Sequence, residues 1–262
     1  MARPIKRYGA SIMRIGLIGS GNMARALAVG WRSPVTCSAV QLEHAQALAD
    51  LVGGSAAATN AEVAANCDLV FLCHKPKQLE VVAAEIAELA HVVVSVLAGV
   101  TLQQLRDLYP QSKVFRIMPN LAAEIGQATI GIVDDDAGDP ELFAELVVLL
   151  EESGDVFAVA ESDFGILTGI SGVGPAYVAL IAQTQVDAAV AEGLDEETAK
   201  SLVGSTLKGS SALLVSRSND SEQICREVAT PGGVTEKGLA VLGGPLREGF
   251  KAAMDAVLGR SR

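Results

Sequence analysis

Short apolar runs alternate with amphipathic stretches over residues 13–160. The apolar runs have the length of buried strands, and the stretches between them place apolar residues at helical spacing. The predicted strands cover residues 15–18, 35–39, 68–73, 92–97, 113–118, 129–133 and 155–159. The first predicted helix ends near Trp31, and the later ones cover residues 42–52, 60–67, 78–89, 102–108 and 140–150. Alternating strands and helices predict an α/β domain with a doubly wound sheet.

From about Glu161 the pattern contains helices only, interrupted by Gly172, Gly174 and Pro175. These helices carry apolar residues on more than one face, among them Leu202, Val203, Leu207, Leu213 and Leu214. One helical layer would leave some of these residues exposed, so we expect a second copy of the chain to cover them. The sequence therefore predicts an α/β domain over residues 13–160 and an all-α dimerisation domain over residues 161–262. Residues 1–12 are predicted to be a disordered N-terminal extension.

A glycine-rich turn joins the first strand to the first helix. Gly19 permits a tight turn, Gly21 lets backbone amides approach a pyrophosphate, and Ala24 lets the helix lie close to the strand. The positive end of the helix dipole then faces the phosphates. This pattern predicts a Rossmann-type domain that binds NAD(P). The cofactor-binding candidates in the turn are Gly19, Ser20, Gly21, Asn22, Met23 and Ala24.

The end of the second strand bears on the choice of cofactor. An acidic residue at this position binds the ribose 2′-hydroxyl in NAD-preferring folds. Here the candidates are Ser38, Ala39 and Val40, none of which is acidic. We take Ser38 as a cofactor-binding candidate and slightly favour NADP(H). No arginine follows either, so NAD(H) stays open as the alternative.

Two further strands end in polar residues at the edge where open α/β sheets bind ligands. The strand at residues 68–73 is followed by His74, Lys75 and Pro76, and the strand at residues 113–118 is followed shortly by Asn120. Lys75 is therefore a site candidate, with a solvated loop lysine as the alternative. His74 is predicted to be a bystander.

Composition excludes some classes of function. The formal net charge of −11 argues against nucleic acid as a partner, because phosphate binding needs clustered Lys and Arg. No uninterrupted apolar stretch approaches the roughly 20 residues of a membrane span. The four cysteines form no CxxC motif and the three histidines show no metal-ligand spacing. We expect a cytosolic protein with no metal site.

Five stretches, in the right order, resemble the pyrroline-5-carboxylate reductase family, and the likeness spans essentially residue 13 to the C-terminus. The first motif is shared with many reductases, whereas the last two are specific. The stretches are Gly-Ser-Gly-Asn-Met-Ala at 19–24, Leu-Cys-His-Lys-Pro at 72–76, Met-Pro-Asn at 118–120, Gly-Ile-Ser-Gly-Val-Gly-Pro-Ala-Tyr at 169–177 and Val-Ala-Thr-Pro-Gly-Gly-Val-Thr-Glu-Lys-Gly-Leu at 228–239.

The resemblance implies hydride transfer from NAD(P)H to the C=N bond of pyrroline-5-carboxylate, giving L-proline. It also implies a helical domain that interlocks with its partner into a homodimer, often arranged into larger rings. By position, Thr230, Gly232, Gly233 and Thr235 would meet the substrate. Cys73, Lys75, Pro76 and Asn120 would line the cofactor or the reacting centre, so that Thr235 and Lys75 are the catalytic candidates.

The physical properties of residues 230–235 agree with this role. Thr230 is a good N-cap and Pro231 suits a first helical turn. The amides of Gly232 and Gly233 can point at a small carboxylate, and the Thr235 hydroxyl can bond the imine nitrogen. The alternative is an ordinary loop between two helices.

The chain departs from the family pattern at three places near the expected site: His74, Val173, and Leu121 with the two alanines after it. These departures leave three alternatives open. One is a paralogue that reduces another cyclic imine. The second is a reductase similar to the deazaflavin-dependent NADP enzymes, which would not explain residues 230–235. The third is a non-catalytic NAD(P)-binding homologue.

Overall fold

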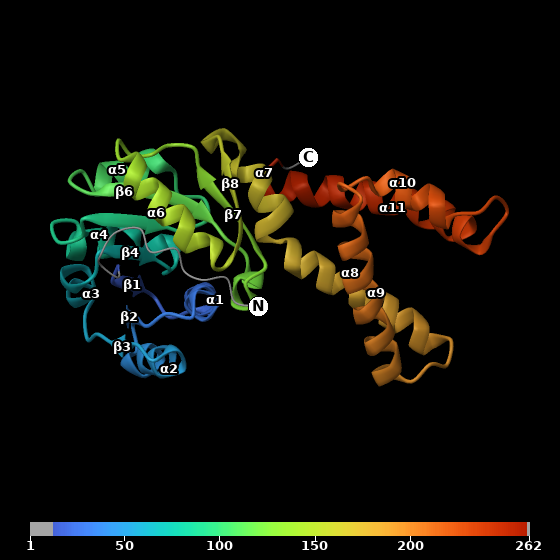
Figure 1. The fold of residues 1–262 in the computed structure, drawn as a ribbon, viewed down its shortest axis with the longest axis horizontal. Coiled ribbons are helices and arrows are strands. Elements are labelled where there is room, and N and C mark those ends of the chain that lie inside the picture. Colours follow the sequence, from blue (N-terminus) through green and yellow to red (C-terminus); the bar gives the residue numbers. More distant parts are fainter. Residues whose placement is uncertain (1–12, 261–262) are drawn as a thin grey trace. The chain divides into compact units, whose positions relative to one another are not determined.

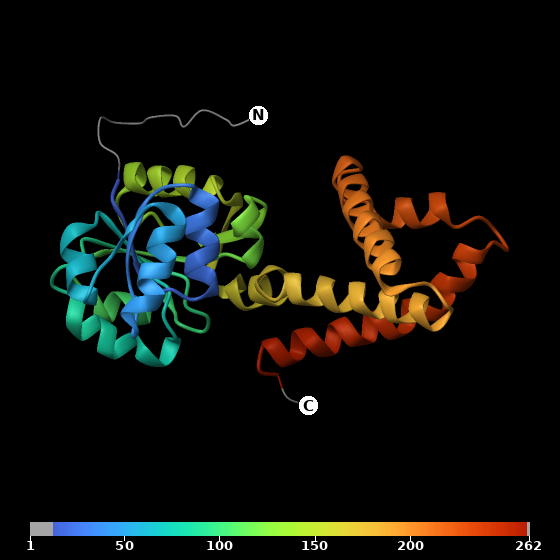
Figure 2. The ribbon, with the colours of Figure 1, turned by 90° about the horizontal axis from the view of Figure 1, so that it is seen from below.

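The computed structural model describes residues 13–260, so the predicted extension at residues 1–12 lies outside the described part of the chain. The chain divides between Val173 and Gly174 into two compact units. The first is an α/β unit and the second consists of helices (Figures 1 and 2).

The first unit is built on an eight-stranded sheet with the order β3-β2-β1-β4-β5-β6-β7-β8. Neighbouring strands run parallel except at β6 and β7, which pair antiparallel. The strand order reverses beside β1 and β4, which is where an open sheet of this kind binds its ligand. The strands are β1 (Ile15–Ile18), β2 (Val35–Ser38), β3 (Ser55–Ala56), β4 (Leu69–Leu72), β5 (Val92–Ser95), β6 (Lys113–Met118), β7 (Ala128–Val133) and β8 (Gly154–Val159).

Helices cover both faces of the sheet and create two separate cores. Strands β1, β4, β5 and β6 contribute alternate side chains to each core, which explains why apolar residues dominate their sequences. One face is covered by α1 (Asn22–Trp31), α2 (Leu42–Val52) and α6 (Pro140–Glu151). The other is covered by α3 (Asn60–Asn66), α4 (Leu79–Ile86) and α5 (Leu102–Leu108).

A buried arginine on β6 holds the segment that follows the sheet. Arg116 is 7% exposed; its Nη1 donates to Glu161 Oε1 at 2.7 Å and its guanidinium lies 4.5 Å from the Phe164 ring centroid. Glu161 also accepts from the backbone N–H of Leu102 at the start of α5. The segment is therefore fixed to two elements of the first unit.

The helical stretch expected from about Glu161 does not begin as one regular helix. It begins with a 3₁₀ turn (η3, Glu161–Asp163), a short α7 (Phe164–Leu167) and a π-helical turn (η4, Thr168–Gly172). The π turn ends directly before α8 (Gly174–Ala191) begins. Single π turns inside helices occur frequently at functional sites.

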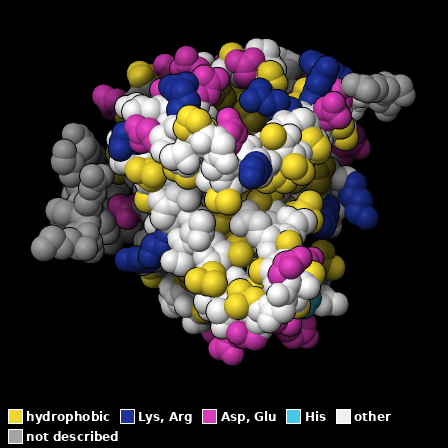
Figure 3. All heavy atoms as spheres, turned by 90° about the vertical axis from the view of Figure 1, so that its right-hand side faces the viewer, with side chains coloured by type: hydrophobic (Ala, Val, Ile, Leu, Met, Phe, Trp, Pro, Cys, Tyr) yellow, Lys and Arg dark blue, Asp and Glu magenta, His cyan; other side chains and the backbone are white. Residues whose placement is uncertain are grey.

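The second unit contains α8, α9 (Glu196–Ser216), α10 (Ser221–Val228) and α11 (Val234–Val257). Among its described residues only Val186 and Ala199 are buried. Hydrophobic side chains are spread over the face shown in Figure 3. The large exposed apolar residues of these four helices include Val178, Leu180, Leu202, Leu213, Val241, Leu242 and Phe250.

One helical run in the described chain is long and apolar enough to cross a membrane by length and composition. It covers Glu161–Ala191, with a mean hydropathy of 1.7, and 17% of the scored window is buried. This run is not an uninterrupted apolar stretch, because it contains polar residues and the irregular turns at residues 161–172. A buried core helix of a soluble protein can also be this long and this apolar.

Candidate active site

The glycine turn after β1 has one glycine that the fold itself requires. Gly19 has φ +106°, and a Cβ at this position would lie 2.7 Å from the carbonyl oxygen of Cys73. Its N–H donates to the carbonyl of Ser38 at 2.9 Å. Gly19 therefore ties together the carboxyl ends of β1, β2 and β4, and a side chain there would separate them.

Gly21 differs, because no protein atom lies within 4 Å of where its Cβ would be. It is the N-cap of α1, it provides no side-chain cap, and the first turn of α1 contains no acidic residue. The first amides of a helix have no partner within the helix, and they attract anions. Ser20, Asn22 and Met23 lie beside this turn, while Ala24 is fully buried against the core. The open amides and the bare Gly21 fit a dinucleotide pyrophosphate.

Ser38 lies at the end of β2 but is 1% exposed. Its hydroxyl donates to Asn60 Oδ1 at 2.6 Å, and Asn60 Nδ2 donates to Glu85 Oε2 at 2.7 Å. The Ser38 proton is thus committed to Asn60, at the corner where a dinucleotide places its adenosine ribose. Asn60 and Glu85 are additional polar groups at this corner.

The predicted residues after β4 lie at the same edge. Burial raises the pKa of the Cys73 thiol to about 12, so the thiol stays protonated at neutral pH. His74 Nδ1 lies 2.9 Å from the Lys75 carbonyl, and burial lowers the pKa of its ring, which keeps the imidazole neutral. Lys75 and Pro76 are exposed, and no ion pair engages Lys75 within residues 13–260. Lys75 provides a free positive charge at this edge.

Asn120, at the carboxyl end of β6, is turned into the protein. It is 7% exposed; its Oδ1 accepts from the Ala122 N–H at 3.1 Å and its Nδ2 donates to the Ser171 carbonyl at 3.2 Å. The side chain therefore connects the cofactor edge to the π turn η4. Both of its functional atoms are occupied by protein partners.

The loop at residues 230–235 belongs to the second unit, and its helix cap differs from the prediction. Gly233, and not Thr230, is the N-cap of α11, because Gly232 takes the left-handed conformation and delays the helix until Val234. The Thr230 carbonyl instead accepts from the Gly233 N–H at 2.9 Å, and the Gly232 N–H donates to Glu236 Oε2 at 2.7 Å. Both glycine amides are thus engaged within the chain.

Thr235 is half-buried in the first turn of α11. No hydrogen bond engages its hydroxyl within the described chain.

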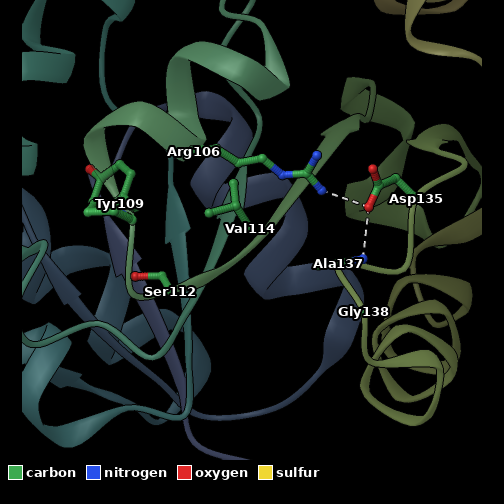
Figure 4. Close-up of a pocket in the computed structure, with 8 residues that line it drawn as sticks. Arg106, Tyr109, Ser112, Val114, Asp135, Ala137 and Gly138 are labelled. Carbon is green, nitrogen blue, oxygen red and sulfur yellow. Dashed lines mark hydrogen bonds and ion pairs between the residues drawn. The ribbon is translucent and has the colours of Figure 1, made fainter.

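A cavity of about 360 Å³ in the first unit lies at the other edge of the sheet (Figure 4). It is lined by Arg106 and Tyr109 from the end of α5 and by Asp135 and Gly138 after β7. Since β7 runs antiparallel to β6, these residues meet at the amino end of β6. An ion pair of 2.7 Å joins Arg106 to Asp135 there and lowers the pKa of that carboxyl. None of the predicted site residues lines this cavity.

Two known protein families match separate parts of the chain. Residues 14–99 match the family described as NADP oxidoreductase coenzyme F420-dependent, and residues 161–262 match the family described as pyrroline-5-carboxylate reductase dimerisation. Pyrroline-5-carboxylate reductase 3 of Bos taurus is 32% identical over 95% of this chain and 84% of its own length. The chain belongs to the pyrroline-5-carboxylate reductase family.

Solved structures of family members agree. The enzyme of Streptococcus pyogenes superposes with a TM-score of 0.85 at 28% identity, covering 95% of this chain and 97% of that one. The reductase of Plasmodium falciparum, solved with NADP bound, shares the fold with a TM-score of 0.86 at 24% identity over 96% and 98% of the two chains. The predicted fold class and the class of NAD(P)-dependent oxidoreductase acting on C=N are confirmed.

The family also explains the second unit. The family described as pyrroline-5-carboxylate reductase dimerisation matches all four helices of this unit. The match also includes the apolar run at Glu161–Ala191. This match begins at residue 161, whereas the compact units divide after Val173. Residues 161–173 therefore belong to the dimerisation family segment yet pack within the first unit.

Sequence reasoning missed three residues. The sequence predicts Asn60 only as the start of a helix. Its polar side chain at the start of α3, beside the end of β2, could have indicated a residue near the cofactor. Arg116 could have been found as a charge inside an otherwise apolar strand. Glu236 could have been found as an acidic residue in the first turn of α11, at a helix start without a side-chain cap.

Proposed function

We propose that this protein is a pyrroline-5-carboxylate reductase that transfers hydride from NAD(P)H to the C=N carbon of pyrroline-5-carboxylate, giving L-proline. The observation that supports the proposal most is the match to a reductase of that name along 95% of the chain. The open amides at the start of α1 bind the cofactor. The turn before α11 binds the substrate.

The residues of the two glycine turns and Lys75 then have the following tasks. The amides and dipole of α1 hold the pyrophosphate, with Gly21 permitting close approach, and the free charge of Lys75 adds positive potential at the same edge. NAD(P)H supplies the hydride. Thr235 bonds the imine nitrogen and orients the ring, with Thr230, Gly232 and Gly233 forming the turn around the substrate. A protonated iminium is already electrophilic, so positioning and charge complementarity provide most of the rate.

We propose that NADP(H) is preferred over NAD(H), because no carboxylate directly follows β2. Glu85 reaches this corner from α4, but it is hydrogen-bonded to Asn60. Titration of the protein with NADPH and NADH, followed by nicotinamide fluorescence, gives the two dissociation constants. A lower Kd for NADH would contradict the preference.

We further propose a homodimer in the cytosol. The dimerisation family segment and the exposed apolar helices support the dimer. All four cysteines are free, as suits a reducing compartment. Burial raises the pKa of the Cys37 and Cys67 thiols, which keeps them protonated. Assembly of dimers into larger rings is an extension of the same proposal.

Steady-state reduction of pyrroline-5-carboxylate tests the reaction, and Thr235 tests the site. Thr235→Val removes the hydroxyl and keeps the shape, and we expect kcat/KM to fall about 10- to 100-fold, as for a lost hydrogen bond to a charged group. Thr235→Ser keeps the hydroxyl and should retain most activity. NAD(P)H affinity should be the same in both variants. Unchanged kcat/KM in Thr235→Val would remove Thr235 from the site, and no imine-dependent oxidation by the native protein would overturn the proposed function.

A further inference from the structure

A chain of side-chain hydrogen bonds closes the corner beside the end of β2. Ser38 Oγ donates to Asn60 Oδ1 at 2.6 Å, and Asn60 Nδ2 donates to Glu85 Oε2 at 2.7 Å. A carboxylate can only accept, so Glu85 requires the amino group of Asn60 to face α4 and the amide oxygen to face Ser38. Three elements, β2, α3 and α4, are therefore joined at this corner, and their joint ends in a carboxylate.

The amino group of Asn60 has a second N–H, and no hydrogen bond engages it within the described residues. Asn60 is only half-buried. In a doubly wound sheet the adenosine ribose of a dinucleotide lies at the end of the second strand, which is this corner. A ligand atom bonded to the second N–H would lie about 5 Å from the Glu85 carboxylate, since the two N–H bonds diverge by about 120°.

Glu85 brings the negative charge to this corner. It is exposed, and no ion pair joins it to a lysine or arginine within residues 13–260. Residues 39–42, which directly follow β2, contain no charged side chain. An unneutralised carboxylate therefore lies near the ribose 2′ position, where NADP carries a phosphate and NAD a hydroxyl.

We propose that Glu85 is a specificity-determining residue that limits the preference for NADP(H) by repelling the 2′-phosphate. The inference rests on the proposed function and deepens its choice of cofactor. The 2′-hydroxyl of NAD(H) carries no charge and meets no such repulsion. The two cofactors share every other group, the pyrophosphate included, so the ratio of their dissociation constants reports the effect at the 2′ position alone.

The expected effect depends on ionic strength. A carboxylate about 5 Å from a phosphate group of charge about −1.5 to −2 in a water-like environment weakens binding by about tenfold. Screening reduces the factor to about threefold at 0.15 M salt and to less than about twofold at 1 M. If Glu85 served only to position the Asn60 amide, its removal would weaken both cofactors alike, without a dependence on salt.

The experiment measures the Kd of NADPH and of NADH by nicotinamide fluorescence in the native protein and in Glu85→Gln. The glutamine keeps an acceptor for Asn60 Nδ2 and removes the charge. At about 10 mM ionic strength we expect the Kd of NADPH to fall about tenfold and the Kd of NADH to change by less than about twofold. In about 1 M NaCl the native protein and the variant should converge.

Glu141→Gln is the matched control. Glu141 is an exposed glutamate in the first turn of α6, which covers the opposite face of the sheet from α4. Its substitution changes the net charge by the same amount and should leave the ratio of the two dissociation constants unchanged. Equal changes for both cofactors in Glu85→Gln, or no change for either, would overturn the proposal.

These binding constants need no turnover, which separates the proposal from the proposed function. If the native protein reduces no pyrroline-5-carboxylate but Glu85→Gln lowers only the Kd of NADPH, only the reaction is wrong. If the imine is reduced and the ratio of dissociation constants does not move, only the role of Glu85 is wrong. If neither cofactor binds the native protein, both fail.

Discussion

The two glycines of the turn after β1 are constrained by different partners. Gly19 has a left-handed backbone and lies against the Cys73 carbonyl, whereas a side chain at Gly21 would meet no protein atom. The fold thus requires glycine at position 19, whereas at position 21 we propose that the cofactor requires it. The structure shows the difference in surroundings, although the motif alone does not.

Substituting the two glycines should separate stability from cofactor binding. Gly21→Val should leave the melting temperature nearly unchanged and abolish measurable NAD(P)H binding, because the side chain fills the space of the pyrophosphate. Gly19→Val should unfold the first unit at lower temperature, because it combines backbone strain with a clash against Cys73. Thermal melts and fluorescence titrations of both variants test this. Retained NAD(P)H affinity in Gly21→Val would contradict the assignment of the cofactor site.

Asn120 is expected to act on the reaction without touching the cofactor. Asn120→Asp keeps the acceptor for Ala122 but places a carboxylate oxygen against the Ser171 carbonyl, which loosens the π turn. We expect a loss of stability of about 1–3 kcal/mol and a lower kcat, with the Kd of NAD(P)H unchanged. Asn66→Asp is the control, because Asn66 Nδ2 also donates to a carbonyl, that of Glu62 within α3, far from this edge in the fold. A raised Kd for NAD(P)H in Asn120→Asp would show that Asn120 contacts the cofactor, as the sequence motif predicted.

At the scale of elements, the segment between the sheet and α8 is held at two points. Arg116 fixes its beginning through Glu161 and Phe164, and Asn120 fixes its end through Ser171. The two anchoring residues lie close together in the sequence: Arg116 is on β6, and Asn120 is two residues beyond its end. This double attachment gives the irregular turns η3, α7 and η4 a defined conformation.

Removing the charge of Glu161 should show how much this attachment contributes to the stability of the first unit. Glu161→Gln leaves the 7%-exposed Arg116 without its ionic partner, and we expect a destabilisation of about 2–4 kcal/mol, seen as a lower urea midpoint of the first unit. Glu227→Gln breaks the exposed pair with Arg217 and should cost less than about 1 kcal/mol. Equal costs for the two substitutions would show that the Arg116 pair is not a buried anchor.

The sequence predicted most regular elements of the first unit, although not the short strand β3, and it made the strand at 92–97 and the helix at 78–89 longer than they are. The limits of β1, α2 and β6 agree with the structure because buried apolar runs and helical periodicity are local signals. The antiparallel pairing of β7 with β6, the π turn and the cap of α11 at Gly233 were not predicted. These features depend on partners distant in the chain, or on a glycine conformation that composition does not reveal.

The site residues stay a prediction, but their place in the fold agrees with the sequence analysis. Gly19, Gly21, Lys75 and Asn120 lie at one edge of the sheet, because they follow the carboxyl ends of the parallel strands β1, β4 and β6. Their individual tasks could not be predicted, because the inward direction of the Asn120 side chain depends on where Ser171 lies.

At the scale of the whole molecule, the second unit cannot bury its apolar surface alone. Its large exposed residues lie in the segment that matches the dimerisation family. Burial of apolar surface between copies is the ordinary driving force of such an association. Stability and assembly of this protein are therefore linked.

The dimer can be tested with a pair of matched substitutions. Leu180 on α8 and Val81 on α4 are both 64% exposed. In detergent-free buffer the native protein should have at least twice the 27.0 kDa chain mass by light scattering, and Leu180→Glu should shift it toward the monomer. Val81→Glu should leave the mass unchanged. A requirement for detergent would contradict the dimer and favour insertion of Glu161–Ala191 into a membrane.

The contrast between Gly19 and Gly21 also concerns how such chains diverge. In a descendant that no longer used a dinucleotide, selection would still retain Gly19, because the fold needs it, but Gly21 would be free to drift. The pair therefore serves as an internal marker for retained cofactor use: a chain that keeps both has had a reason beyond folding to do so. This chain keeps both, which weighs against a non-catalytic scaffold that has abandoned its nucleotide.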